Sequence, residues 1–226
     1  MKICFVTEGS LEDFWENGLR EVGAPDLLVF GFHGLKSLSY KKELDGETEY
    51  FHDVAILSRE LSCTVVCGCY TETYDTRRAS AVIADKGRIL GVSDMAHALH
   101  GGELACGGGF RVYDASACKI GLLIGEDLFF PEAGRVLTLC DAELVLSVFP
   151  PLESALPQVV MRATAFCNGV TVAMCSTGAC QIADIKGEIA LESRAKIVRA
   201  DVNLQKDYHL ISCRRRGIYR EIHTGF

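Results

Sequence analysis

The sequence predicts an α/β protein in which most strands are buried. Short apolar runs rich in β-branched residues alternate with stretches that carry apolar residues at three-to-four spacing. The 226 residues are 49% hydrophobic with a mean hydropathy of +0.18, which indicates a large core. No linker or low-complexity segment divides the chain, so we expect one domain over residues 1–226, a size that α/β domains commonly reach (about 200–250 residues).

The elements follow from these two patterns. The apolar runs predict strands at 2–7, 26–31, 63–69, 79–84, 88–92, 119–124, 143–149, 169–175, 180–184 and 197–202. The helical spacing predicts helices at about 10–22, 52–61, 131–140 and 154–167. The stretches "VIADKGRILG" (82–91) and "IADIKGEIAL" (182–191) each predict a β-hairpin, with Gly87 or Gly187 in the turn. One similar hairpin in each half suggests two related sheets packed together.

Charge and hydropathy exclude several classes of partner. A net charge of −7 and a pI near 5.4 argue against a nucleic-acid or anionic-membrane surface. No apolar run approaches the ~18 residues that a membrane-spanning helix needs. The N-terminal residues 1–7 lack the features of a signal peptide and are typical of a first strand. We therefore expect a cytoplasmic protein without nucleic-acid or membrane partners.

The eleven cysteines indicate a reducing compartment rather than a disulfide framework. Their number is odd, they form no CxxC pair, and most lie in apolar runs typical of strands. The densest cluster, "CTVVCGC" (63–69), alternates with Val and Thr as in a buried strand, and it has no His or second Cys pair at ligand spacing. We expect no metal site and no cofactor.

The stretch "KIGLLIGEDLFFPEAGRVLTL" (119–139) has the form of an active-site frame. An apolar run ends at Gly125, two carboxylates follow at Glu126 and Asp127, and a helical pattern begins at Pro131. A strand that ends in a sharp turn before a helix often exposes a nucleophile. Here the residue in the turn is a glycine, which has no side chain to react.

These pieces, taken in order, resemble the nitrilase or carbon–nitrogen hydrolase superfamily over nearly the whole chain. The most specific piece is the frame Ile-Gly-x-x-Ile-x-x-Asp-x-x-Phe-Pro-Glu within 119–151. The segments that carry the resemblance are "APDLLVFGFHGL" (24–35), "RASAVIADKGRILGVSDMAHAL" (78–99), "KIGLLIGEDLFFPEAGRVLTLCDAELVLSVFPP" (119–151), "TAFCNGVTVAMCSTG" (164–178), "IADIKGEIA" (182–190) and "RRRGIYREI" (214–222). The resemblance implies a four-layer αββα sandwich, usually paired through helices into an αββα–αββα dimer.

The resemblance also implies a catalytic triad, which this chain lacks. Family members use a cysteine thiolate as nucleophile, a glutamate as base and a lysine that stabilises the tetrahedral intermediate. Carried over by position, the glutamate site is Phe32, the lysine site is Met95 and the cysteine site is Gly125. A shift of one residue restores none of the three, because the neighbours are Gly31 or His33, Asp94, and Ile124 or Glu126.

The replacements suit a site that has lost its charges as a unit. Removing one member of a buried ionic group leaves the others unpaired, at about 3–5 kcal/mol, and the apolar side chains of Phe32 and Met95 avoid that cost. The family's Arg-Ala-x-Glu-Asn-Gly segment is Thr-Ala-Phe-Cys-Asn-Gly at 164–169, which removes two more ionic groups. The loop that usually follows the strand near Cys175 is almost absent, so we expect a shallow, open or reshaped pocket.

Some residues with reactive side chains remain near the expected pocket. Cys175 or Cys180 is a candidate for a displaced nucleophile, with His33 as its base, although a buried strand cysteine and a hydrogen-bonding loop histidine are the simpler interpretations. Glu103 resembles a glutamate that supports the family's lysine, and we place it at the pocket rim. We expect Asp127 to orient its turn through backbone hydrogen bonds rather than to pair with Glu126 in acid–base work.

Two further segments are interpreted as structural. The glycine-rich stretch "GGELACGGG" (101–109) lacks the spacing of a phosphate-binding loop, and we expect a mobile loop beside the vacated pocket. The basic run 214–216 is expected to form salt bridges within the domain or across a dimer.

The sequence therefore favours a protein of this superfamily that no longer hydrolyses C–N bonds. We expect it to bind a small molecule or protein partner, or to serve as a scaffold, as a homodimer or a higher homo-oligomer. The alternatives are an amidase-like hydrolase with a relocated nucleophile at Cys175 or Cys180, and a structural partner of an active homologue.

Overall fold

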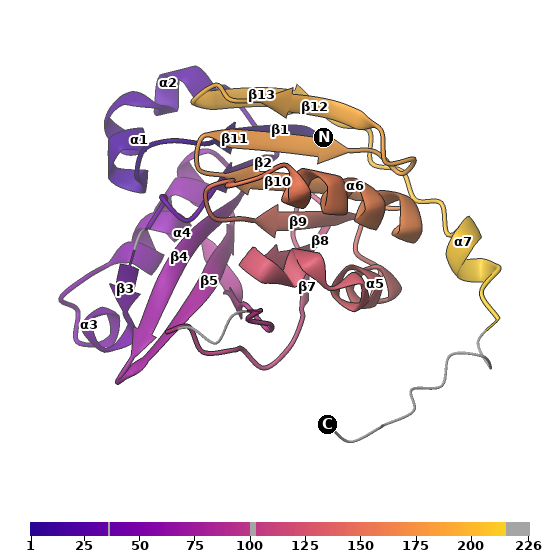
Figure 1. The fold of residues 1–226 in the computed structure, drawn as a ribbon. Helices are drawn as coiled ribbons and strands as arrows, with labels where there is room; N and C mark the ends of the chain where they lie inside the picture. Colours follow the sequence, from indigo (N-terminus) through magenta and orange to yellow (C-terminus); the bar gives the residue numbers. More distant parts are fainter. Residues whose placement is uncertain (36, 100–102, 216–226) are drawn as a thin grey trace.

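Two β-sheets packed face to face form the centre of the chain, and helices cover their outer faces (Figure 1). The structure is a computed structural model that describes residues 1–35, 37–99 and 103–215. Apolar side chains from both sheets, among them Phe5, Ile83, Leu122 and Leu146, form the middle core cluster. The predicted αββα sandwich is confirmed.

The first sheet contains seven strands. Its order is β13 (Ile197–Asp201), β1 (Lys2–Val6), β2 (Leu27–Phe30), β4 (Thr64–Thr73), β5 (Thr76–Asp85) and β6 (Arg88–Asp94), and β3 (Ser37–Ser39) also pairs with β4. The strands β1, β2 and β4 run parallel, whereas β13, β5 and β6 join their neighbours antiparallel. Every residue of β2 is buried, as its continuous apolar run predicts.

The second sheet has six strands in the order β12 (Ile189–Ser193), β11 (Ala179–Ala183), β10 (Thr171–Ser176), β9 (Leu144–Val148), β8 (Lys119–Ile124) and β7 (Val112–Asp114). Both predicted hairpins form, as β5–β6 and β11–β12, and Gly87 and Gly187 have φ values of +93° and +74° in their turns. Each hairpin supplies an edge strand, one in each sheet. The two similar hairpin sequences, 82–91 and 182–191, therefore lie at an edge of their respective sheets.

The helices lie outside the sheets. They are α1 (Leu11–Asn17), α2 (Leu19–Val22), α3 (Tyr40–Leu44), α4 (Tyr50–Glu60), α5 (Pro131–Leu139), α6 (Leu156–Asn168) and α7 (His209–Ser212), with a 3-10 turn η1 (Gly125–Phe129). Side chains of α1 and α4 form an outer core cluster with the first sheet, and those of α5 and α6 form another with the second. Pro131 begins α5, and Gly169 ends α6 in the left-handed conformation.

Some elements differ from the sequence prediction. The helix expected at 10–22 is divided at Gly18, where an added Cβ would lie 2.3 Å from the Phe14 ring. The short elements β3, α3, β7 and α7 were not predicted, because three to five residues are too few to establish a period. Among the described residues, no helix is long and apolar enough to cross a membrane.

Candidate functional site

The sharp turn after β8 leads from a strand towards a helix, and the residue in the turn is a glycine. Strand β8 ends at Ile124, and Gly125 opens η1 with a φ of +53°, in the left-handed region that L-amino acids rarely adopt. Gly125 is buried. The glycine therefore occupies a conformation in which any side chain would add strain.

Met95 fills the space beside this glycine. It directly follows β6, its amide donates a hydrogen bond to Ala79 O (2.8 Å), and its carbonyl accepts one from Gly107 N (2.7 Å). The side chain is 3% exposed, and its sulfur lies 3.0 Å from the position that a Cβ on residue 125 would take. The thioether is therefore in tight contact with the point at which a nucleophilic side chain would begin.

Phe32 lies in the same buried cluster as Met95. It follows β2, is 5% exposed, and stacks on Tyr70 with a ring-centroid distance of 5.1 Å and an interplanar angle of 22°. The guanidinium of Arg77 lies over the Tyr70 ring, 4.6 Å from its centroid. The positions inferred for the three catalytic groups thus hold two buried apolar side chains and a bare glycine.

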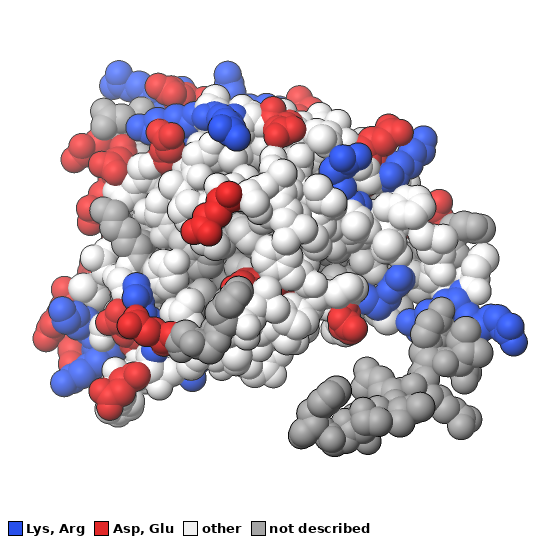
Figure 2. All heavy atoms as spheres, viewed as in Figure 1, with Lys and Arg blue, Asp and Glu red and all other residues white. Residues whose placement is uncertain are grey.

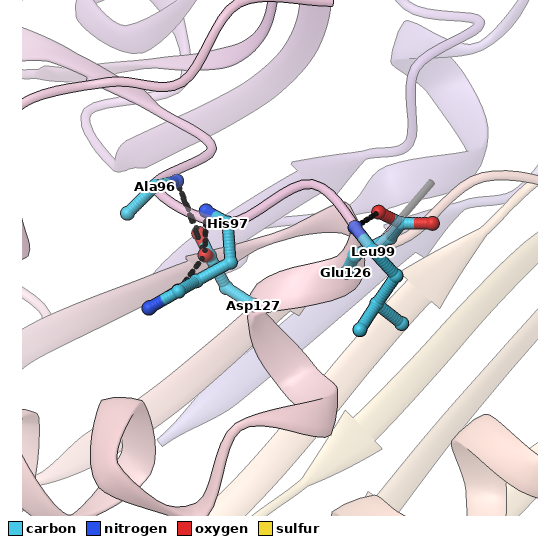
Figure 3. Close-up of polar contacts among 5 residues, drawn as sticks. All are labelled: Ala96, His97, Leu99, Glu126 and Asp127. Carbon is cyan, nitrogen blue, oxygen red and sulfur yellow. Dashed lines mark hydrogen bonds and ion pairs between the residues drawn. The ribbon is translucent and has the colours of Figure 1, made fainter. Parts of the chain in front are cut away.

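The two carboxylates after Gly125 hold a backbone segment (Figure 3). Asp127, 1% exposed, accepts hydrogen bonds from the amides of Ala96 (3.0 Å) and His97 (2.9 Å), and His97 Nδ1 donates another at 2.9 Å. Glu126 accepts one from the amide of Leu99. Asp127 was expected to orient its own turn, but it binds the backbone of the segment that carries Met95.

The surroundings of Asp127 shift its pKa in two opposite directions. Burial raises the pKa of this carboxyl above its usual range, although the hydrogen bonds from Ala96 and His97 act in the opposite direction. The His97 ring stacks on Phe130 with centroids 4.0 Å apart and lies 5.7 Å from Phe110. The sequence reasoning did not single out His97, because its partner lies 30 residues away and no local spacing marks the pair.

His33 makes hydrogen bonds within the fold. Its Nε2 donates to Val6 O at 3.0 Å, and its Nδ1 accepts from the hydroxyl of Thr177 at 3.2 Å, an assignment that satisfies both partners. Burial is the main cause that lowers the pKa of His33. This arrangement fits the simpler interpretation of His33 as a hydrogen-bonding loop residue.

The two candidate thiols are buried partners on neighbouring strands. Cys175 in β10 pairs in register with Cys180 in β11, and the two are 0% and 1% exposed. The Cys175 thiol faces the carbonyls of Val6 (3.6 Å) and Val29 (3.7 Å). Burial raises the pKa of Cys175 well above its usual range and that of Cys180 to about 12, so both stay protonated near neutral pH.

The remaining predicted features are Glu103, the loop after β10, the glycine-rich stretch and the C-terminal segment. Glu103 is exposed, next to Leu104, which forms a β-bridge with Arg77. The loop after β10 is short as expected, since only residues 177–178 separate β10 from β11. Residues 101–102 of the glycine-rich stretch and 216–222 of the C-terminal segment lie outside the described residues.

Within 1–35, 37–99 and 103–215, no group of three or more His, Cys, Asp or Glu side chains is arranged to hold a metal ion. The polar groups closest to Gly125 in sequence, Glu126 and Asp127, already accept backbone hydrogen bonds. The site therefore offers mainly the apolar side chains of Phe32 and Met95, while Glu126 and Asp127 are engaged with the backbone.

Known proteins similar to this chain share its architecture. Residues 15–208 match the family model described as Carbon-nitrogen hydrolase. A nitrilase from Pyrococcus abyssi is 31% identical over 125 residues, which are 50% of this chain and 45% of that relative. The chain therefore matches less than half the length of this curated relative.

Solved structures extend the similarity over nearly the whole chain. A carbon–nitrogen hydrolase from Helicobacter pylori G27 superposes with a TM-score of 0.79 at 17% identity, covering 97% of each chain. A mutant of an amidase of the nitrilase superfamily from Nesterenkonia AN1 superposes with a TM-score of 0.77 at 19% identity, covering 96% of this chain and 95% of the amidase. At these identities the likeness establishes the fold.

Proposed function

Because the chain belongs to the carbon–nitrogen hydrolase family, we propose that it keeps the family's fold without its hydrolysis and acts as a non-catalytic scaffold subunit. The observation that carries this proposal is the contact at residue 125. A nucleophile there would begin 3.0 Å from the Met95 sulfur on a backbone with φ of +53°. The inferred base and lysine positions hold Phe32 and Met95, which can neither accept a proton nor stabilise an oxyanion.

The filled site favours a scaffold over a small-molecule receptor. Phe32 and Met95 are 5% and 3% exposed, and Gly125 is also buried. A ligand at the former centre would have to displace the Met95 side chain from its contact with Gly125. Ligand sites are usually concave and largely preformed, whereas the residues at this centre are buried in contact with other side chains.

The outer face of the second sheet supports a homodimer. Large apolar side chains on α5 and α6 are exposed there, among them Leu139 (53%) and Val159 (57%). Figure 2 shows this face mostly white, with only isolated charged side chains within it and more of them towards the edges of the view. Large exposed apolar patches with polar rims mark interaction sites.

An amidase-like activity from a relocated cysteine is the weaker proposal. A reactive thiol needs a lowered pKa and access to substrate. Cys175 and Cys180 are buried, and burial raises the pKa of both. His33, the suggested base, uses both ring nitrogens in hydrogen bonds to Val6 and Thr177.

A turnover assay tests the proposal directly. The purified chain, incubated with a panel of aliphatic and aromatic amides and nitriles, should release no ammonia above the rate of a heat-denatured control. Thiol labelling under the same conditions should find neither Cys175 nor Cys180 reacting faster than the exposed Cys106. Turnover that is lost in Cys175→Ser or Cys180→Ser would establish the relocated-nucleophile alternative instead.

A further inference from the structure

A cavity on the outer side of the first sheet lies between α1 and α4. It encloses about 250 Å³ and is lined by residues of α1, α4, β3 and the loop after β2. Its two aromatic residues, Trp15 and Tyr50, are partly buried against the outer core cluster of this sheet. Phe32 and Met95 belong instead to the middle cluster between the sheets. The cavity is therefore separate from the site around Gly125.

Each of the two helices contributes one carboxylate and one aromatic ring to the cavity. On α1 these are Glu12 and Trp15, and on α4 they are Asp53 and Tyr50. Both pairs are three residues apart, a spacing that places side chains on the same face of a helix. Two rings and two acidic groups therefore line one small space.

The charge of the cavity is negative and is not neutralised within the chain. In the part of the chain that the structure describes, no Lys, Arg or His nitrogen lies within 4.0 Å of the Glu12 or Asp53 carboxylate. Burial is the main cause that raises the pKa of Asp53, and the neighbouring His52 acts in the opposite direction. The carboxylates of Glu49, Glu43 and Glu12 raise this pKa further. A positive charge in the cavity would relieve this repulsion.

We propose that this cavity binds a small organic ammonium ion. Trp15 and Tyr50 would contact its alkyl groups, and Glu12 and Asp53 would face its charge. The faces of tryptophan and tyrosine rings attract cations, and alkylated ammonium groups are recognised by such rings. The inference is independent of the proposed scaffold role, because it concerns a different region of the molecule.

The lining of the cavity favours an organic cation over a metal ion. Calcium takes about six to eight oxygen ligands, and magnesium requires octahedral coordination. Among the residues whose placement is described, no group of three or more His, Cys, Asp or Glu side chains is arranged to hold a metal ion. Aromatic walls suit the methyl groups of an alkylammonium ion, which a metal ion does not have.

The cavity contains its own reporter, because Trp15 is the one tryptophan in the sequence. Titration with choline chloride at constant ionic strength should change the Trp15 fluorescence in a saturable way, and sodium chloride should not. Dimethylbutanol, which has the shape of choline without its charge, should bind at least about fivefold more weakly. Isothermal titration calorimetry gives the same dissociation constants without relying on the fluorophore.

Variants that remove one charge test the two carboxylates. Glu12→Gln and Asp53→Asn should each raise the choline dissociation constant about threefold to fivefold, and the double variant should raise it further. Both substitutions keep the size of the side chain, and urea denaturation checks that the variants are folded. Glu16→Gln is the matched control, because Glu16 is exposed on α1 and lies outside the cavity lining. It should bind choline as the wild type does.

Four results would overturn the inference. The first is the absence of saturable binding in both fluorescence and calorimetry. The second is equal affinity for choline and dimethylbutanol, which would show that the cavity recognises shape alone. The third is an unchanged choline dissociation constant in the folded Glu12→Gln/Asp53→Asn variant. The fourth is displacement of choline by calcium chloride at lower concentration, which would assign the cavity to a metal ion.

Discussion

Glycine at position 125 fits both the backbone and the space that this turn leaves. The φ of +53° costs glycine little, and the Met95 sulfur lies 3.0 Å from the point where a side chain would start. In the family, the corresponding residue is expected to be a cysteine flanked by charged groups. Here the Met95 thioether lies beside the glycine, and the Phe32 ring belongs to the same buried cluster as Met95.

Restoring the nucleophile alone should therefore damage the protein. Gly125→Cys should lower the free energy of unfolding by about 1–3 kcal/mol, because the new side chain meets the left-handed backbone and the Met95 sulfur. Urea denaturation measures the change. Gly108→Ala is the matched control, since its Cβ would enter open space. Equal stability of the two variants would contradict the filled-site interpretation.

His33 gives the stability a predictable dependence on pH. Its pKa is lowered in the folded chain, so below about pH 6.5 the unfolded chain binds more protons at this residue than the folded chain does. The stability that His33 contributes is thus lost as pH falls from about 6.5 towards the lowered pKa. In His33→Gln, the rise in unfolding free energy between pH 5 and 7 should be shallower than in the wild type. A slope in His33→Gln that equals the wild-type slope would show that His33 is not its source.

At the scale of elements, the turn η1 and the segment that follows β6 act as one unit. Asp127 binds the amides of Ala96 and His97, and Glu126 binds that of Leu99, so both carboxylates fix the segment that carries Met95 (Figure 3). The stacked rings of His97 and Phe130 add an apolar contact to the same junction. The turn after β8 thus fixes the backbone next to Met95, whose side chain contacts Gly125.

Removing the buried carboxylate should loosen this junction. Asp127→Ala should lower the free energy of unfolding by about 1–3 kcal/mol, because two part-buried backbone amides and the His97 ring lose their acceptor. Hydrogen exchange should accelerate at Ala96 and His97. Glu126→Ala is the comparison, and it should accelerate exchange at Leu99 with a smaller loss of stability. Unchanged exchange at Ala96 in Asp127→Ala would refute this role.

At the scale of the whole molecule, the exposed apolar side chains are distributed unevenly. The face over α5 and α6 exposes apolar side chains with only isolated charged ones among them, which suits association (Figure 2). The opposite end of the first sheet carries the β4–β5 hairpin, whose turn exposes a single large side chain, Tyr74 (97%). An isolated exposed residue of this kind needs no partner.

Association should therefore depend on the helical face. Leu139→Lys and Val159→Lys should each raise the dimer dissociation constant at least about tenfold, because each places a charge in an apolar contact. Light scattering over a concentration series measures the change. Tyr74→Lys, an equally drastic substitution at the hairpin, should leave the dimer unchanged. A dimer that is weakened only by Tyr74→Lys would place the interface elsewhere.

The chain order of strands and helices could be predicted because each long element carries its own period. The buried strand at 119–124, the helix at 131–140 and the two glycine hairpins were all found from residues adjacent in sequence. The four-layer arrangement came from the resemblance of ordered motifs rather than from periodicity. Short elements such as β3 and β7 were missed because pairing with a neighbouring strand, not local pattern, forms them.

The sequence by itself determined which side chains stand at positions 32, 95 and 125, because they can be read directly from the motifs. Only the tertiary structure decided what these and the neighbouring residues contact. The Met95 contact with Gly125, the Asp127 hydrogen bonds to residues 96–97, and the cavity between α1 and α4 all join residues distant in sequence or on separate elements. The physical reason is that packing and hydrogen-bond satisfaction depend on distances that the folded sheets and helices set.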